Sequence, residues 1–185
     1  MLTSVSQDED AILSGIREVV APVAASVEID DTDLAIVEAL VADGRISLRQ
    51  LAAQLGLSAP TISERMSRLE RAGVITGYSA QVDWSVLGHG QVVFLSIKAA
   101  AGRSVSDIMR SLWEIPEVED MTVVTGDLDL LAKLRVRDYA HLREILLNSI
   151  WQIGGIQNTS TMLAIAEMPP KSFAAGLLAG RRAPR

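Results

Sequence analysis

The chain has 185 residues, of which 49% are hydrophobic and 22% charged, and its formal net charge is −6. This composition predicts a globular protein of one or two small domains and excludes an intrinsically disordered chain. The absence of cysteine excludes disulfides and thiolate metal sites. The two histidines, His89 and His141, do not have the spacing of metal ligands, so we expect no metal and no cofactor.

Nothing in the sequence predicts a membrane or secreted protein. No apolar run approaches the roughly 20 residues that cross a bilayer. The chain starts with the acids Asp8, Glu9 and Asp10 rather than with basic residues and an apolar leader. We therefore expect a cytoplasmic protein with no membrane partner.

Charge is unevenly distributed along the chain. Residues 1–28 form an acidic extension, predicted to contain one helix that ends near Pro22, and residues 169–185 form a basic tail. Residues 45–72 hold five arginines and only two acids. In an otherwise acidic protein, this compact basic segment is where a DNA contact is expected.

Residues 29–78 show three short helical patterns, each with apolar residues at every third or fourth position. Each pattern is bounded by residues that begin or end helices. These boundaries are Asp43-Gly44 after the first helix, Ser47 and Gly56 around the second, and Ser58 and Gly73 around the third. Two helices joined by the tight turn at residues 56–58 predict a helix-turn-helix. Residues 74–78 read as a strand, at the place expected for a wing.

A second domain is predicted over residues 92–168, after a linker strand at residues 79–91. In chain order we expect a strand at 92–98, a helix at 104–113, strands at 118–124 and 130–136, a helix at 138–154, and a strand at 156–166. This β-α-β-β-α-β order predicts an α+β, ferredoxin-like domain with an antiparallel sheet and both helices on one face. The first strand is apolar on both faces, so the helix-free face also needs a cover. A second copy of the chain is the simplest cover, which predicts a homodimer.

The third helix carries the candidate DNA contacts. If Ile62, Met66 and Leu69 face inward, polar side chains line the opposite side of the helix. Arginines can grip guanine edges or phosphates, and hydroxyl groups can bond to either. The candidate DNA-binding residues are Arg45, Ser47, Arg49, Ser58, Pro60, Thr61, Ser63, Glu64, Arg65 and Arg68. A solvated face in which Glu64 pairs with Arg68 would use the same residue types, but the two caps, the tight turn and the arginine excess together favour DNA binding.

The turn at residues 125–129 is a candidate ligand site. Asp127 and Asp129 can receive a ligand's ammonium group while backbone amides meet its carboxylate, and Thr159 and Thr161 on the last strand offer hydroxyl groups. A β-turn favours Gly and Asp on conformational grounds alone, and threonine is a common strand residue. On these residues alone, the plain turn is the simpler interpretation.

Catalysis is not indicated. The sequence has no glycine-rich phosphate loop of the usual spacing and no cysteine nucleophile, and its acids are distributed rather than gathered. We therefore predict no catalytic residues and a protein that is not an enzyme.

Over roughly residues 29–168 the chain resembles the Lrp/AsnC (leucine-responsive, or feast/famine) family of prokaryotic regulators. The shared positions in the N-terminal half are Ile29-Asp30, Asp33, Asp43-Gly44-Arg45, Ser47, Leu51-Ala52, Leu55-Gly56-Leu57-Ser58, Arg65, Leu69-Glu70, Gly73-Val74-Ile75, Gly77-Tyr78 and Leu87-Gly88. Those in the C-terminal half are Thr125-Gly126-Asp127, Asp129, Gly155-Ile156 and Thr159-Ser160-Thr161. Two positions depart from the family pattern: Ala59 stands where proline is usual, and Leu128 where an aromatic residue is frequent.

The resemblance implies a winged helix-turn-helix, a β-linker and a βαββαβ domain that dimerises and builds tetramers or octamers. Members of this family commonly bind amino acids or related metabolites near the Gly-Asp-x-Asp turn and change their assembly or DNA affinity in response. By position, that role would fall to Gly126, Asp127, Leu128, Asp129 and Thr161.

The hypothesis is thus an oligomeric, nucleoid-associated regulator that binds double-stranded DNA in a sequence-specific way and responds to a small metabolite. One alternative is a metabolite-binding oligomer without DNA binding. Another is a protein–protein adaptor that uses the helix-turn-helix as a docking face.

Overall fold

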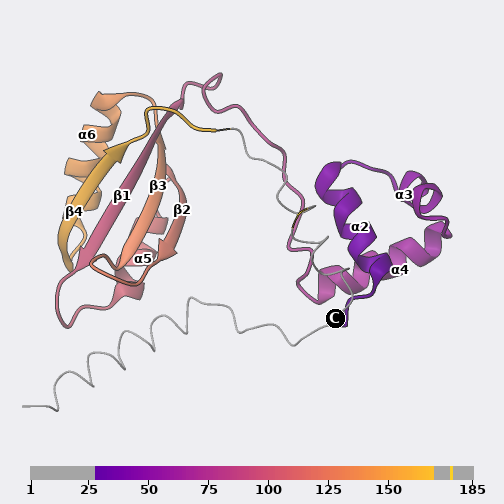
Figure 1. Cartoon of the computed structure of the whole chain (residues 1–185). Coiled ribbons are helices and arrows are strands. Elements are labelled where there is room, and N and C mark those ends of the chain that lie inside the picture. Colours follow the sequence, from indigo (N-terminus) through magenta and orange to yellow (C-terminus); the bar gives the residue numbers. More distant parts are fainter. Residues whose placement is uncertain (1–27, 169–175, 177–185) are drawn as a thin grey trace, which may run out of the picture. The chain divides into compact units, whose positions relative to one another are not determined.

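A computed structural model describes residues 28–168 and Gly176. Over these residues the chain divides into two compact units that meet in sequence at Gln81 and Val82. The first is helical, and the second contains a four-stranded sheet (Figure 1). The predicted helix within residues 1–28 and most of the basic tail lie outside the described residues.

The helical unit contains α2 (Asp31–Ala42), α3 (Leu48–Leu55) and α4 (Ala59–Arg71). Ser47 and Ser58 are the N-caps of α3 and α4, as predicted, because each side chain accepts a hydrogen bond from a backbone N–H in the first turn. Gly56 ends α3 with φ 67°, a left-handed conformation that glycine adopts without strain. The tight turn between α3 and α4 therefore follows from local sequence.

The three helices pack around one small apolar core. Its buried members are Ile36, Ala39, Leu51, Ala52, Ile62 and Leu69. Ile62 and Leu69 come from α4 and are fully buried, which fixes the face of α4 that points inward. The predicted inward face of the third helix is confirmed.

Two predicted strands are absent from the described residues. Residues 74–78, expected as a wing strand, contain no strand, and the linker strand expected at residues 79–91 is absent up to Gln91, where β1 (Gln91–Ala99) begins. A strand needs a hydrogen-bonded neighbour, and the described part of the helical unit contains no strand with which either segment could pair. Their apolar composition suggested strands, but composition alone supplies no partner.

The second unit follows the predicted β-α-β-β-α-β order. Its elements are β1 (Gln91–Ala99), α5 (Val105–Trp113), β2 (Val118–Val123), β3 (Leu130–Val136), α6 (Tyr139–Asn148), the short 3-10 helix η1 (Ile150–Gln152) and β4 (Ile156–Leu163). The strands form one antiparallel sheet in the order β2-β3-β1-β4. This confirms the ferredoxin-like architecture. The second helix is shorter than predicted, because its last turn is the 3-10 helix η1.

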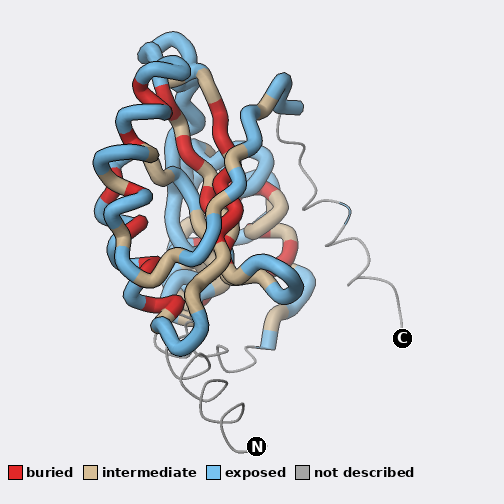
Figure 2. Tube along the Cα trace, turned by 90° about the vertical axis from the view of Figure 1, so that its left-hand side faces the viewer, coloured by how far each residue is buried: buried red, intermediate tan, exposed pale blue. Residues whose placement is uncertain are grey.

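Helices α5 and α6 cover one face of the sheet (Figure 1). Alternate residues of the central strands, including Val93 and Leu95 of β1 and Ala132 and Leu134 of β3, pack against them. Buried and half-buried positions alternate along β3, and Figure 2 shows the buried segments in red. The core of this unit therefore lies between the helices and the sheet.

The opposite, helix-free face mixes apolar and charged side chains. Phe94 and Leu131 are half-buried there, and Met162 is 48% exposed. Lys133 and Arg135 of β3 lie on the same face and pair with Glu119 and Glu167. The nitrogen–oxygen distances are 3.4 and 3.0 Å for Lys133 and 2.8 and 3.4 Å for Arg135. Glu119 lies where the β2–β3 register shifts between Val118 and Asp120, so it occupies a β-bulge on an edge strand.

Candidate DNA-binding face and ligand site

Both hydroxyl groups predicted at helix starts cap their own helices. The Ser47 side chain accepts from the Gln50 backbone N–H at 3.2 Å, and the Gln50 side chain accepts from the Ser47 N–H at 3.0 Å. Ser58 accepts from the Thr61 N–H at 3.3 Å, and the two hydroxyl groups lie 2.8 Å apart. Ser47, Ser58 and Thr61 therefore fix where α3 and α4 begin.

Arg65 and Arg68 do not project freely from α4. Arg65 Nη1 donates to Asp30 Oδ2 at 2.7 Å and to Asp33 Oδ1 at 2.9 Å. Arg68 Nη2 donates to the other oxygen of Asp33. Asp33 is fully buried, while the side chains of Arg65 and Arg68 are 28% and 43% exposed. The expectation that both guanidinium groups point outward is not met, because a buried carboxylate on α2 holds them.

This network changes the electrostatics at the start of α2. The hydrogen bond from Arg65, together with one from the Asp33 backbone, lowers the pKa of Asp30 below its usual 3.8. The hydrogen bonds to Asp30 and Asp33 raise the pKa of Arg65 above its usual value. We refer to Asp30, Asp33, Arg65 and Arg68 as the arginine clamp. The clamp joins the start of α2 to α4.

Asp33 was missed as a functional residue in the sequence. It lies in the first turn of α2, where an acid is explained by the helix dipole and by the capping box it forms with Asp30. Its second role depends on arginines 32 and 35 residues later. The only signal for this second role was that two arginines on α4 accompany an acid at the start of α2, a helix whose other residues are mostly apolar.

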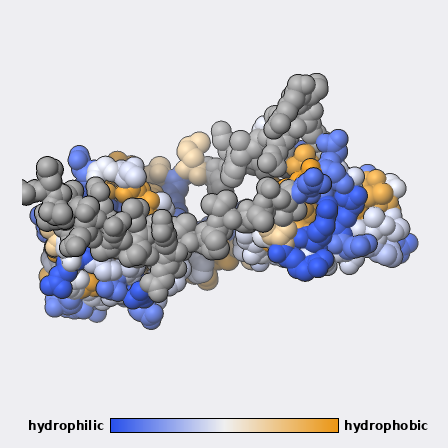
Figure 3. Space-filling model, turned by 90° about the horizontal axis from the view of Figure 1, so that it is seen from below, coloured by the Kyte–Doolittle hydropathy of each residue, from blue (hydrophilic) through white to orange (hydrophobic). Residues whose placement is uncertain are grey.

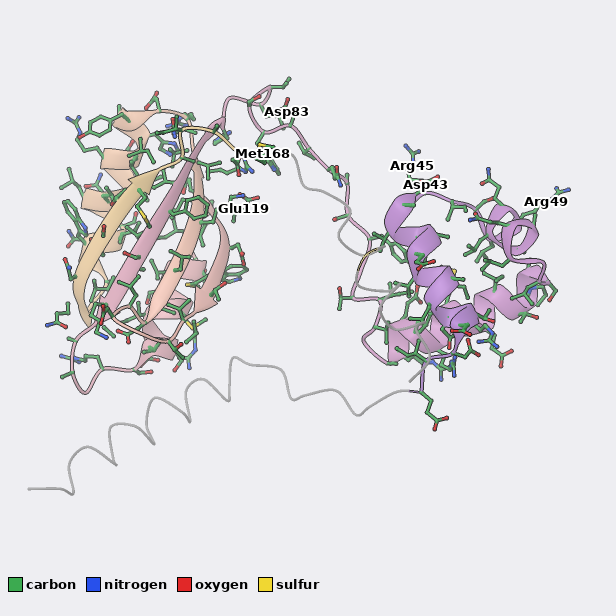
Figure 4. All side chains as sticks on the ribbon, viewed as in Figure 1. Asp43, Arg45, Arg49, Asp83, Glu119 and Met168 are labelled. Atoms are coloured by element: carbon green, nitrogen blue, oxygen red, sulfur yellow. The ribbon has the colours of Figure 1, made fainter. Side chains whose placement is uncertain are left out.

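The remaining candidate DNA contacts are exposed. Arg45 and Arg49 extend outward from the helical unit (Figure 4). Pro60, Ser63 and Glu64 are exposed on the first two turns of α4. Hydrophilic residues gather over the face of this unit that Figure 3 shows.

The predicted ligand turn is partly tied into the sheet. Asp129 Oδ2 accepts from the Ala99 N–H at 2.7 Å, and Oδ1 lies 3.3 Å from Lys98 Nζ. Gly126, Asp127 and Leu128 are exposed at the tip of the turn. Asp129 therefore braces the β2–β3 turn against the end of β1, which the turn motif alone did not indicate.

A cavity of about 310 Å³ adjoins Asp129. Small residues at positions 99–102 form one wall, and Lys98, Arg103 and Gln157 add polar groups. Gly155 lies against the Arg103 stem: a Cβ there would come within 3.3 Å of Arg103 Cβ, and its φ is 97°. Lys98, Arg103 and Gln157 were not among the predicted ligand residues, because they lie far from the turn at residues 125–129 in the sequence.

Thr159 and Thr161 do not line this cavity. Both lie on β4, opposite Ile97 and Leu95 of β1. The Thr159 hydroxyl accepts a hydrogen bond from Trp151 Nε1 at 3.2 Å. Within one copy of the described chain, the Asp129 cavity and the β4 hydroxyl groups are therefore separate features.

The acidic and histidine side chains of the described residues are dispersed. Among them, no three His, Asp or Glu side chains gather closely enough to hold a metal ion. His141 Nε2 lies 3.0 Å from Glu117 Oε1, and its Nδ1 accepts from the Arg137 N–H at 3.2 Å. This pattern places the ring proton on Nε2 and fixes the imidazole as a link between α6 and the start of β2.

No helix in the described part of the chain is long and apolar enough to cross a membrane.

Two family models match the chain, one over each unit. Residues 29–76 match winged helix-turn-helix DNA-binding domains. Residues 92–171 match the Lrp/AsnC ligand binding domain. Together with the capped α3–α4 pair and the α+β unit, these matches define a DNA-binding transcription regulator with a ligand-binding domain.

Known regulators match this chain in sequence over most of their own length. The HTH-type transcriptional regulator FL11 of Pyrococcus furiosus is 34% identical over 137 residues, which are 74% of this chain and 89% of the relative. Regulatory protein AsnC of Escherichia coli is 31% identical, over 74% of this chain and 90% of AsnC. The solved structure of E. coli AsnC superposes with a TM-score of 0.74 at 28% identity and covers 80% of this chain and 99% of that one. The chain belongs to the Lrp/AsnC family.

Proposed function

We propose that the helical unit places the N-terminal half of α4 in the major groove of duplex DNA. The observation that carries this proposal is the exposure of Pro60, Ser63 and Glu64, on the side of α4 opposite its buried residues. Recognition helices contact base edges through their N-terminal residues. Arg45 and Arg49 are placed to hold flanking phosphates, while Ser47, Ser58 and Thr61 set the helix starts.

Arg65 and Arg68 act in this proposal mainly through the arginine clamp. The Arg68 side chain is 43% exposed, so in this proposal it can also contact a phosphate. Loss of binding in Arg65→Ala would therefore mix a DNA effect with a folding effect. Arg49 gives the cleaner test, because it is exposed and outside the clamp.

The test is fluorescence anisotropy with a duplex obtained by binding-site selection, titrated with salt. We expect the affinity to fall steeply with salt, and Arg49→Ala to weaken binding and reduce the logarithmic salt slope by about 1. Arg143→Ala, an exposed change on α6, is the matched control. A wild-type chain without salt-sensitive DNA binding would favour the metabolite-binding oligomer instead.

The proposed effector is an amino acid held in the Asp129 cavity. Arg103 supplies a cation for the ligand carboxylate, and Asp129 keeps acceptor capacity for the ammonium group, since two of its roughly four acceptor positions are used. One relative, from Haemophilus influenzae, is named leucine-responsive regulatory protein and is 30% identical over 147 residues. Gly126, Asp127, Leu128, Thr159 and Thr161 lie outside this cavity, so in this proposal they contribute only where copies of the chain meet.

Thermal-shift screening of the amino acids and their keto acids tests the effector. A ligand at 100 times its Kd stabilises the folded state by about 2.7 kcal/mol. We expect an amino acid to raise the melting temperature, its keto acid to do so less, and Arg103→Ala to abolish the shift. Arg137→Ala, at the other end of the sheet, should preserve it. An equal shift in both variants would contradict the proposed site.

We further propose that a second copy of the chain covers the helix-free face and that the protein is regulatory rather than catalytic. The half-buried Phe94 and Leu131 and the exposed Met162 support the dimer. Dimers can then associate into tetramers or octamers. Binding to chromosomal DNA would place the protein at the nucleoid, in the cytoplasm.

A further inference from the structure

The outward face of α4 centres on an acid. Pro60, Glu64, Ser67 and Arg71 are all exposed and follow one another at intervals of four, three and four residues. This spacing forms one stripe along a helix. It lies opposite Ile62 and Leu69, which are fully buried. Glu64 therefore occupies the middle of the surface that would enter the groove.

The arginine clamp leaves this acid without its expected partner. Arg68 is four residues after Glu64, the spacing of a helical ion pair, but its guanidinium bonds to Asp33 instead. Among the described residues, Glu64 forms no ion pair and no side-chain hydrogen bond. The nearby acid Glu70 differs, because it accepts a hydrogen bond from the Tyr78 hydroxyl at 3.0 Å.

A carboxylate discriminates between base edges by its chemistry. An ionised carboxylate only accepts hydrogen bonds. In the major groove, guanine presents two acceptors and thymine presents an acceptor and a methyl group, so both repel or fail to bind it. Adenine pairs its N6 donor with the N7 acceptor, whereas cytosine presents the N4 donor alone. Cytosine is therefore the base edge that suits Glu64 best.

We infer that Glu64 is a specificity-determining residue that selects a cytosine in each DNA half-site. This inference rests on the proposed entry of α4 into the major groove. The acid is also repelled by the phosphates, so it lowers affinity for DNA in general and raises the penalty at a wrong base. Glutamine in its place would lose the repulsion and could pair bidentately with adenine N6 and N7.

The experiment is parallel binding-site selection from a random duplex library with the full chain, Glu64→Gln and Glu70→Gln. We expect wild type and Glu70→Gln to select a cytosine at the same half-site position and Glu64→Gln to select adenine there. Replacing that cytosine with adenine should weaken wild-type binding about tenfold or more and should strengthen binding by Glu64→Gln. Glu64→Gln should also bind unrelated DNA more tightly than wild type.

Two results would overturn the inference, and they are distinguishable. If wild type and Glu64→Gln select the same base at every position, Glu64 does not read DNA, although the proposed function stands. If the wild-type chain selects no sequence at all, the proposed function fails, and the inference about Glu64 fails as well.

Discussion

A single buried carboxylate organises the charged side of the helical unit. Asp33 is fully buried, yet both of its oxygens accept hydrogen bonds from arginines of α4. A buried ion that loses its partners is costly, whereas a fully bonded one is tolerated. The clamp therefore sets the orientation of α4 relative to α2, and so the orientation of the face proposed to read DNA.

Asp33→Asn should destabilise the helical unit by about 2 kcal/mol. The loss is below that of a fully buried pair because both arginines are partly exposed to water. Asp31→Asn, two residues away in the same turn and exposed, is the matched control and should change stability by about 0.5 kcal/mol. Urea unfolding followed by circular dichroism measures both. Equal midpoints for the two variants would show that the clamp contributes nothing.

Acidification should remove the contribution of Asp30. Its folded-state pKa lies below 3.8 because Arg65 donates a hydrogen bond to it. The stabilisation is therefore complete above the unfolded pKa and is lost as the pH falls through the folded value. Asp30→Asn keeps a good N-cap residue but lacks the charge. Wild type should be the more stable of the two at about pH 5. It should lose that advantage progressively as the pH falls below 3.8 and through the lowered pKa of Asp30. An advantage that does not change with pH would contradict this assignment.

At the scale of elements, local sequence predicted most of the fold. Ser47, Gly56 and Ser58 set the ends of α3 and α4, and alternation of apolar residues set β3 at residues 130–136 as predicted. These signals are local because capping and pleating involve neighbours in the chain. The wing and linker strands at 74–90 were wrong, since strand formation depends on a distant partner that composition does not reveal.

The candidate sites were less predictable for the same reason. The exposed residues of α4 follow from helical spacing alone. The clamp and the Asp129 cavity instead join side chains from distant segments, so the arginines were assigned to DNA and Arg103 was overlooked. The class of protein was inferred correctly, although the arginine argument for it was incomplete.

Capping offers a test at this scale. Ser47→Ala removes an acceptor for the Gln50 N–H and breaks the reciprocal capping box at the start of α3. We expect a loss of about 1 kcal/mol in stability. Ser63→Ala, exposed within α4, should change it by less than about 0.5 kcal/mol. Thermal and urea unfolding of both variants measure the difference, and identical stabilities would contradict a capping role.

At the scale of the whole molecule, β4 offers matched probes of self-association. Met162 and Leu163 are adjacent and each is 48% exposed, but Met162 faces the helix-free side and Leu163 the helix side. Met162→Glu should weaken the proposed dimer at least about tenfold, because it would bury an unpaired charge. Leu163→Glu should leave the dimer intact. Analytical ultracentrifugation checks both, and a monomeric wild-type chain would refute the proposed dimer.

The bulge on β2 limits how far copies of this chain can add to one another through their sheet edges. A sheet with two open edges can in principle grow without limit, since each edge can template a strand from another molecule. On the β2 side, the shifted register at Glu119 and the acids beside it, Glu117 and Asp120, interrupt the straight backbone ladder that an incoming strand requires. Polymerisation by strand addition needs both edges of the sheet to accept a strand, and the bulge on β2 disfavours this at one edge. Copies of this chain should therefore close into finite particles rather than extend into fibres.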